Sequence, residues 1–465
     1  MNSKIKPSGV ILLFLLIVAT MFTSLVVLKV EPHIPLFFCV ILTGIFAVFW
    51  GADWKTIEKG LISGVVSGIQ PLLLLIMISF VIASWMMSGA VPTLLFYGMN
   101  IIQPEWFALS ALFITILVST FTGSSFTTAS TVGVALMGIA HVLNVNPGLA
   151  AGAIVCGACF GDKMSPLSDS TNLASGTVGV NLFEHIRHMM WTTVPALIIT
   201  AVIFFFAGHQ PSGTSIAQLS EMKKTLGEHF TITPFTLISP LIVMVMAFRK
   251  MPIIPTLLTG VVTAVLTTLF LNPAFTIAHM INALENGLNM KTGSDAVDAI
   301  VNKGGLIPMM WSVSLIIIAL SLGGLLQELG IIDIMIRSFE NSLKKTGHLI
   351  AATAASGLGV NLLTGEMYLS IILPGQAFKK HYEKNGVPLI NLTRTMEDAG
   401  TLINPLVPWS VSGAFFAATL GVSALDYIPF AFLLYLSPLF TLFYGYTGIG
   451  LAKKKGHAET LSKAS

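Results

Sequence analysis

A dense run of polar residues interrupts an otherwise apolar stretch of the chain between Gly161 and Asn172. The run contains charged side chains, and charges inside such a segment are costly unless they are paired or hydrated, so they usually mark a functional site. Pro166 lies within the run and breaks a helix because proline has no N–H to donate. The carbonyl, hydroxyl and carboxylate oxygens around such a break are ligands that hard cations prefer. The candidate cation ligands in this run are Asp162, Ser165, Ser168, Asp169, Thr171 and Asn172.

A second polar stretch, from Glu397 to Pro405, interrupts a later apolar segment in the same way. Five acids and two bases then fall inside apolar segments: Asp162, Asp169, Glu366, Glu397 and Asp398, with Lys163 and Arg394. This excess of negative charge favours Na⁺ or H⁺ over an organic anion, and one carboxylate can hold either cation. Competition between them at a carboxylate is the simplest antiport device, so Glu366 and Asp398 join the candidate ligands.

Structural roles are the alternative for many of these residues. Lys163 could form a permanent ion pair with Asp398, and Glu366 could cap a helix, since an acid is favoured at a helix N-terminus. The hydroxyl and amide side chains of the first run could instead satisfy backbone groups freed at the break. Near the expected inner surface, a solvated or snorkelling side chain is the simpler interpretation of His185, His188 and Arg394.

The composition excludes a water-soluble enzyme. Hydrophobic residues make up 54% of the 465 residues and charged residues 10%, against about 25% charged in ordinary globular chains. Only three cysteines are present, which excludes a disulfide scaffold. We find neither a nucleophile with its base nor a metal-ligand spacing, so we expect no enzyme, no cofactor and no nucleic-acid partner. The chain is expected to be an all-α polytopic membrane protein.

Ten apolar stretches are long enough to cross a bilayer core of about 30 Å as helices. They are Ser8–Leu28, Ile34–Trp50, Pro71–Ser88, Pro147–Val180, Met190–Ala207, Pro234–Phe248, Pro252–Leu271, Leu306–Leu326, Leu389–Ala418 and Tyr427–Tyr446. Ten crossings put both termini on one side. With that side cytoplasmic, 17 of the 24 Lys and Arg residues lie inside and 5 lie outside, as the positive-inside rule requires. Two sizeable polar segments, Gln210–Phe230 and Asn272–Gly304, are then outer loops.

Two further segments, Trp106–Leu143 and Leu349–Phe378, each consist of two apolar arms around a polar, glycine-containing tip. The arms of the second are too short to cross, so we predict two re-entrant hairpins, which membranes tolerate where protein or water surrounds the tip. Two tilted crossings in each segment are the alternative.

The two halves of the chain echo each other. Thr122-Gly123 matches Thr364-Gly365, Pro166-Leu167 matches Pro405-Leu406, and Ser175-Gly176 matches Ser412-Gly413. Five crossings per half require the second repeat to be inverted, with broken helices meeting at the midplane. The predicted organisation is a first repeat at 1–208 (scaffold helices 8–88, hairpin 106–143, broken helix 147–180, helix 190–207), a linker at 209–231, a second repeat at 232–447 (hairpin 349–378, broken helix 389–418) and a cytoplasmic tail at 448–465.

The run GDKMSPLSDSTNLASG, beginning at Gly161, resembles the signature of the NhaC family of Na⁺/H⁺ antiporters in the ion transporter superfamily. The resemblance implies a carrier of the bacterial inner membrane that exchanges cytoplasmic Na⁺ for external H⁺. It also implies an elevator-type movement and importance for the matching residues from Asp162 to Asn172. Some relatives couple these ions to malate and lactate, so a Na⁺- and H⁺-coupled organic-anion exchanger, with Arg394 or Lys163 as anchor, is the alternative. A homodimer is possible for carriers of this kind.

Overall fold

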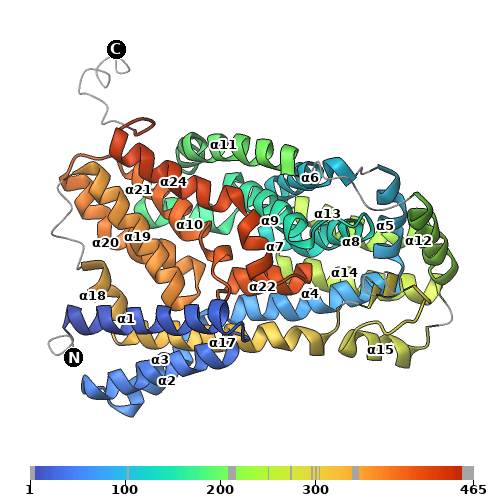
Figure 1. Ribbon diagram of the computed structural model, residues 1–465, viewed down its shortest axis with the longest axis horizontal. Coiled ribbons are helices and arrows are strands. Elements are labelled where there is room, and N and C mark those ends of the chain that lie inside the picture. The colour runs from blue at the N-terminus through green and yellow to red at the C-terminus, as the bar shows by residue number, and fades with distance from the viewer. Residues whose placement is uncertain are drawn as a thin grey trace.

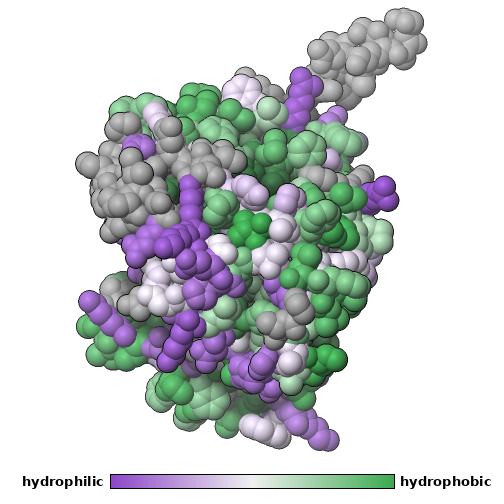
Figure 2. All heavy atoms as spheres, turned by 90° about the vertical axis from the view of Figure 1, so that its right-hand side faces the viewer, coloured by the Kyte–Doolittle hydropathy of each residue, from purple (hydrophilic) through white to green (hydrophobic). Residues whose placement is uncertain are grey.

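The computed structural model describes residues 6–101, 104–207, 216–249, 251–272, 275–294, 297–298, 301–302, 304–337 and 345–452. Within these ranges every regular element is a helix. Most helices run along the long axis, and the start of α1 (Pro7–Phe22) lies at the same end as the close of α24 (Phe432–Thr447), which we name the termini end (Figure 1). The helices α12 (Ile216–His229) and α15 (Ile277–Asn286) lie at the opposite end, named the loop end. Figure 2 shows hydrophilic side chains gathered over part of the loop end.

Apolar stretches at helical length fold into the elements of the first half of the chain. After α1 these are η1 (Thr23–Val27), α2 (His33–Phe49), α3 (Trp54–Ser67), α4 (Ile69–Met87), α5 (Ala90–Ile101), η2 (Pro104–Trp106), α6 (Phe107–Thr122), α7 (Ser125–Thr128), η3 (Ala129–Gly133), α8 (Val134–Val142), α9 (Pro147–Met164), α10 (Asp169–Val178) and α11 (Leu182–Ala207). Helix α3 lies between two of the predicted crossings, in a segment for which no crossing is predicted. Helix α11 begins well before the predicted Met190.

The second half follows a similar order. After α12 it contains η4 (Pro234–Leu237), α13 (Ile238–Phe248), α14 (Ile253–Leu271), α15, α17 (Leu306–Glu328), α18 (Ile331–Arg337), α19 (Thr346–Thr364), α20 (Met367–Lys384), α21 (Leu389–Met396), η6 (Glu397–Thr401), η7 (Asn404–Leu406), α22 (Val411–Leu420), α23 (Ala424–Tyr427), η8 (Ile428–Phe430) and α24. The predicted tail from 453 onward lies outside the described residues.

The prediction of a polytopic helical membrane protein is confirmed at this level. Of the described helices, five are long and apolar enough to cross a bilayer, and up to eight qualify if each bent pair is one span. One of the five is the continuous helical segment Ser125–Val142, the second arm of the first predicted hairpin. The ten crossings and the re-entrant course of the hairpins stay predictions.

The helices pack as two groups. In the first group, α17 packs along α2, α3 and α4, while α14 packs on α4 and α13. In the second group, α9 packs along α6, α10 along α20, and α24 along α11 and α19. The groups meet where α17 contacts α19 and α22, and where α5 contacts α8. The candidate site residues from Asp162 to Asn172 lie in the second group.

Matching structural features recur in the two halves at one constant separation along the chain. Gly123 and Gly365 end α6 and α19 with φ of 68° and 65°, a left-handed conformation that glycine adopts without strain. Ser168 and Ser410 are the N-caps of α10 and α22. The two Ser-Gly pairs matched from sequence are not equivalent, because Ser175 lies in the last turn of α10 whereas Ser412 lies in the first turn of α22.

Close packing of glycines joins α3 to α17, which makes Gly64 sensitive to any added atom. A methyl group on Gly64 would lie 2.0 Å from the Leu320 carbonyl oxygen, whereas one on Gly44 of α2 would meet nothing within 4 Å. We expect Gly64→Ala to lower the free energy of unfolding by about 2 kcal/mol through overpacking, and Gly44→Ala to leave it unchanged or higher. Thermal unfolding of the two purified variants measures the difference, and equal stabilities would contradict the close contact.

Candidate functional site

The broken helix α9–α10 forms the centre of the candidate site. Helix α9 ends at Met164, residues 165–168 are not helical, and α10 starts at Asp169. The Ser165 hydroxyl accepts a hydrogen bond from the Leu167 N–H at 3.2 Å, and the Ser168 hydroxyl caps α10 by accepting from the Thr171 N–H at 3.5 Å. Proline at position 166 explains the break, because it cannot continue the hydrogen-bond ladder of α9.

Two more side chains of the run hold backbone oxygens freed by the break. Thr171 donates its hydroxyl to the Lys163 carbonyl at 3.0 Å. The Asn172 amide donates to the carbonyls of Pro166 and Ser168 at 2.9 and 2.7 Å. Thr171 and Asn172 thus satisfy backbone groups freed at the break, which is the structural alternative to cation binding. The hydroxyl oxygens and the Asn172 amide oxygen still keep lone pairs that a cation can use.

Asp162 ties the break to the tip of the first predicted hairpin. Its Oδ2 accepts hydrogen bonds from the Ser125 N–H at 2.9 Å and the Ser125 hydroxyl at 2.7 Å. The tip lies so close to the break that a methyl group on Gly123 would lie 2.6 Å from Cβ of Leu167. The amino end of the helix that starts at Ser125 therefore faces the Asp162 carboxylate, an arrangement that favours negative charge.

Asp169, by contrast, is exposed, and among the described residues none donates a hydrogen bond to its carboxylate. The exposed residues of α10 and its end, Asp169, Asn172, Gly176 and Gly179, recur at helical spacing and so share one face. This face carries polar and small residues, whereas lipid-facing helices here expose residues such as Phe37, Phe38 and Ile41 of α2. The stripe leads from the break to the cavity at the termini end that Gly179 and Ala452 line.

The helix that starts at the second predicted hairpin tip lies beside the same broken helix. Glu366 is buried and caps α20, its Oε2 accepting from the N–H groups of Tyr368 and Leu369 at 2.7 and 3.1 Å. This cap is the structural role that the sequence suggests for Glu366 as the alternative to cation binding. Helix α20, which starts at this tip, packs along α10, and a methyl group on Gly375 of α20 would lie 3.0 Å from Cγ2 of Thr177. Both tips therefore converge on the broken helix α9–α10.

Lys163 and Asp398 form an ion pair in which both side chains are completely buried. Asp398 also accepts hydrogen bonds from the Ser437 hydroxyl at 2.5 Å and from the Thr441 hydroxyl. Both carboxylate oxygens are thus engaged by α9 and α24, and a cation could reach Asp398 only if this network opened. The pair joins the two broken helices of the second group of helices.

Three residues expected near the inner surface are buried instead. Arg394 is fully buried; it donates to the Gly450 carbonyl at 2.7 Å and stacks 5.8 Å from the Tyr444 ring centroid. His185 and His188 lie in the first turns of α11 rather than in a solvated loop, and His188 hydrogen bonds with Asn391 at 3.0 Å. The surface interpretation of the two histidines was wrong because α11 starts eight residues earlier than predicted and places them against the interior. Arg394 is buried because α21 packs against α11, α19, α20 and α24.

Ser125, Ser437 and Thr441 hold the site acids and were not singled out from the sequence for this role. Ser125 lies in the polar tip of the first predicted hairpin, while Ser437 and Thr441 are isolated hydroxyls in an apolar helix. They recur one helical turn apart on α24, which is the only sequence signal that they face a common partner.

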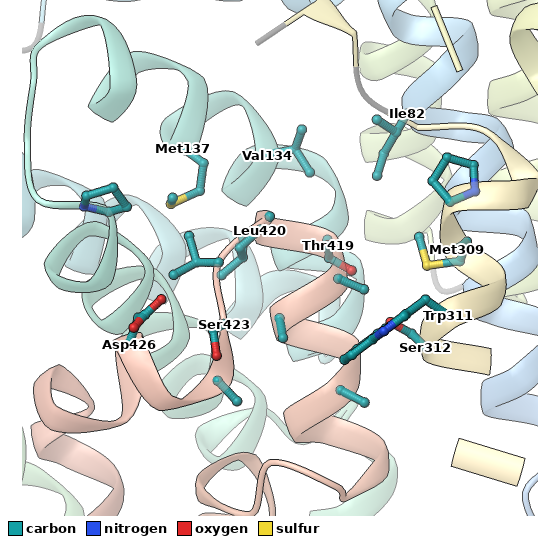
Figure 3. Close-up of a pocket in the computed structure, with 18 of the residues that line it drawn as sticks. Ile82, Val134, Met137, Met309, Trp311, Ser312, Thr419, Leu420, Ser423 and Asp426 are labelled. Atoms are coloured by element: carbon teal, nitrogen blue, oxygen red, sulfur yellow. The ribbon is translucent and has the colours of Figure 1, made fainter. Parts of the chain in front are cut away.

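A large cavity lies away from these acids, between the two groups of helices at the loop end. Its volume is about 1290 Å³, and it is lined by Ile82 of α4, Met309 and Trp311 of α17, Met137 of α8, and Leu420 of α22 (Figure 3). Within the described part of the chain, no three His, Cys, Asp or Glu side chains converge as a metal-binding group. A cation held at the α9–α10 break would therefore need hydroxyl and carbonyl oxygens in addition to carboxylates.

The sequence of the chain is similar to those of known Na⁺/H⁺ antiporters. A model of the Na⁺/H⁺ antiporter family matches residues 157–449. The Na⁺/H⁺ antiporter NhaC of Alkalihalophilus pseudofirmus is 51% identical over 458 residues, covering 98% of this chain and 99% of that protein. NhaC of Bacillus subtilis is 45% identical over 436 residues, 93% of this chain and 96% of that protein. The malate-2H⁺/Na⁺-lactate antiporter of Bacillus subtilis is 33% identical over 441 residues, 93% and 94% of the two chains.

Proposed function

The chain belongs to the Na⁺/H⁺ antiporter family, and from that premise we propose that it is a secondary active transporter that exchanges cytoplasmic Na⁺ for external H⁺ across the bacterial plasma membrane. The observation that carries the proposal is the unneutralised anionic site at the α9–α10 break. Asp162 and the exposed Asp169 lie there, and Lys163, the basic residue of this run, is already paired with Asp398.

In this proposal Na⁺ binds at the break between Asp162 and Asp169. Oxygens of Ser165, Ser168, Thr171 and Asn172 complete the coordination. Glu366 and Asp398 support the site from the second half of the chain, through the hairpin tip and through Lys163. Protonation of the binding carboxylates excludes Na⁺, and Na⁺ excludes the proton, so one site carries the two ions in turn.

The proposed movement is an elevator step of the second group of helices along the first. Both broken helices and both hairpins belong to the second group, in keeping with two inverted repeats and with both termini in the cytoplasm. The features that recur at constant spacing support the duplication. The cavity between α4 and α17 on one side and α8 and α22 on the other leaves room at the loop end for relative displacement (Figure 3).

The organic-anion exchanger is the second candidate, because one relative is named as a malate and lactate antiporter. Its expected anchors were Lys163 and Arg394. Lys163 is neutralised by Asp398, and Arg394 is buried against Gly450 and Tyr444, away from the break. Lys163 is thus already paired and Arg394 does not lie at the α9–α10 break, which favours simple cation exchange.

An assay in inverted membrane vesicles decides between the two functions. Respiration first acidifies the vesicle interior, and an acridine dye reports the pH gradient. We expect added NaCl alone to dissipate the gradient, and vesicles without the protein to show no response. If NaCl has no effect while malate or lactate triggers proton movement, the organic-anion exchanger replaces the antiporter.

A further inference from the structure

Two cavities occupy matching positions in the two halves of the chain. The cavity at the termini end, about 840 Å³ in volume, is lined by residues 179–181 and Glu184, which follow α10. The loop-end cavity is lined by residues 421–423 and Asp426, which follow α22 at the separation that also relates the N-caps of the two helices (Figure 3). Glu184 and Asp426 are both exposed. The cavities are therefore equivalent openings at opposite ends of the molecule, each with an acid that attracts cations.

The two cavities differ in their access to the α9–α10 break. On α10, Asp169 and Asn172 are exposed on the polar stripe that leads to the termini end. The matching positions on α22 are Val411 and Ala414, which are only 4% and 1% exposed, and α22 packs against α17. A polar route from the break is thus open towards the termini end, whereas α22 offers none towards the loop end.

Three aromatic rings from α7 and α22 pack together beside Asp162. Phe126 follows Ser125, the residue that holds the Asp162 carboxylate. The Phe126 ring stacks on Phe415 with centroids 3.9 Å apart and packs edge-on against Phe416 at 5.8 Å. Phe415 and Phe416 also contact each other edge-on at 5.6 Å. This cluster is apolar, and α7 and α22 lie nearer the loop end than α10 does (Figure 1).

The two segments that carry the rings also form walls of the loop-end cavity. Val134 belongs to the continuous helical segment Ser125–Val142, and Leu420 belongs to α22 (Figure 3). The walls touch again between the cavity and the rings, since a methyl group on Gly133 would lie 3.2 Å from Cδ2 of Leu420. The ring cluster therefore lies between the cavity and Asp162, where the two walls meet.

An apolar contact of this kind stops hydrated ions. A narrow apolar constriction excludes water, and an ion that entered it would lose its hydration shell. A carrier that exchanges two ions must keep its site closed on one side while it is open on the other, because access from both sides at once is a leak. We propose that the loop-end cavity is the second entrance to the ion site for hydrated Na⁺ and protons, and that Phe126, Phe415 and Phe416 form the seal that closes it in this conformation. This inference rests on the proposed exchange of Na⁺ for H⁺.

Phe126→Ala should open the seal and uncouple the two ions. Liposomes are loaded with radioactive Na⁺, and valinomycin with K⁺ on both sides balances the charge. The unmodified protein should release Na⁺ in a fixed ratio to the protons taken up, after subtraction of proton movement in vesicles without Na⁺. We expect Phe126→Ala to release about tenfold more Na⁺ per proton, the ratio that corresponds to about 1.4 kcal/mol of lost ring packing.

Two further variants serve as controls for this ratio. Phe126→Leu keeps an apolar side chain at the seal and should retain the ratio of the unmodified protein. Phe113→Ala removes a ring that is 50% exposed on α6, so it should leave the ratio unchanged.

A second experiment tests whether the seal opens during exchange. Phe126→Cys and Phe415→Cys are combined in a protein whose three native cysteines, all buried, are replaced by alanine. Dibromobimane joins two neighbouring thiols and then fluoresces, which reports the fraction joined. The joined protein should neither exchange nor leak ions, whereas each single-cysteine variant should still move Na⁺ after the same treatment.

Three results overturn the proposal. A monodisperse Phe126→Ala protein with the unmodified ratio would show that the rings seal nothing. A monodisperse Phe126→Ala protein that moves neither ion would give the rings a role in the fold or the ion site instead. Continued exchange by the joined protein would show that the loop-end cavity is no entrance. Failure of the unmodified protein to exchange Na⁺ for H⁺ would instead contradict the proposed function, before any variant is compared.

Discussion

Replacing Asp169 with asparagine is expected to abolish the Na⁺-dependent proton movement in inverted vesicles at NaCl concentrations that saturate the unmodified protein. Asparagine keeps the size of the side chain but removes the charge of the most accessible carboxylate at the α9–α10 break. Loss of one charged ligand should weaken Na⁺ binding by about 100-fold, because each 1.4 kcal/mol of binding free energy is worth about a factor of ten. The measurement is the half-saturating NaCl concentration for dissipation of the pH gradient.

The matched control for this prediction is Asp333→Asn. Asp333 is an exposed acid on α18, remote in the sequence from both broken helices. The control should leave the NaCl response unchanged at equal protein level. A half-saturating concentration for Asp169→Asn within threefold of the unmodified protein, a difference well below about 1 kcal/mol, would remove Asp169 from the ion site.

Breaking the buried ion pair should have the largest effect on stability. Lys163→Gln leaves the Asp398 charge buried without its counterion, and the removal of one partner from such a pair typically costs about 3–5 kcal/mol. The double variant Lys163→Gln, Asp398→Asn removes both charges and should recover most of the loss, because two amides can share hydrogen bonds with Ser437 and Thr441. Thermal unfolding of the purified single and double variants tests this.

An exposed ion pair provides the control. Lys59 and Glu328 also pair, at 2.7 Å, but the Lys59 side chain is 69% exposed. Lys59→Gln should therefore change the free energy of unfolding by less than about 1 kcal/mol. If Lys163→Gln were as mild as Lys59→Gln, the pair would not be the structural link between the broken helices α9 and α21–α22.

Much of the fold was predictable because membrane helices depend on local composition. Apolar length located α2, α14, α17 and α24 within a few residues, and Pro166 located the break between α9 and α10. Glu366 emerged as both a candidate ligand and a helix cap, and the structure shows the cap. The Lys163–Asp398 pair was one of the alternatives considered, since an opposite charge is the cheapest partner for a buried charge.

The contacts between distant segments were not predictable from one sequence. Nothing local in Ser125 indicates that its N–H and hydroxyl will bind Asp162, because that contact depends on how the hairpin tip packs on the break. His185 lies among polar residues of the sequence, which predicts a solvated loop. The prediction is wrong because His185 belongs to the first turn of α11 and is buried. Burial of such groups is decided by tertiary packing, which hydropathy does not encode.

The central claim is that Na⁺ and H⁺ exclude each other at carboxylates held around the α9–α10 break. The most direct test adds NaCl to purified protein in weakly buffered detergent solution and records proton release with a pH-sensitive dye. The account predicts that the unmodified protein releases protons in a saturable way, and that the double variant Asp162→Asn, Asp169→Asn releases none. Absence of proton release from the unmodified protein, or undiminished release from the double variant, would contradict it.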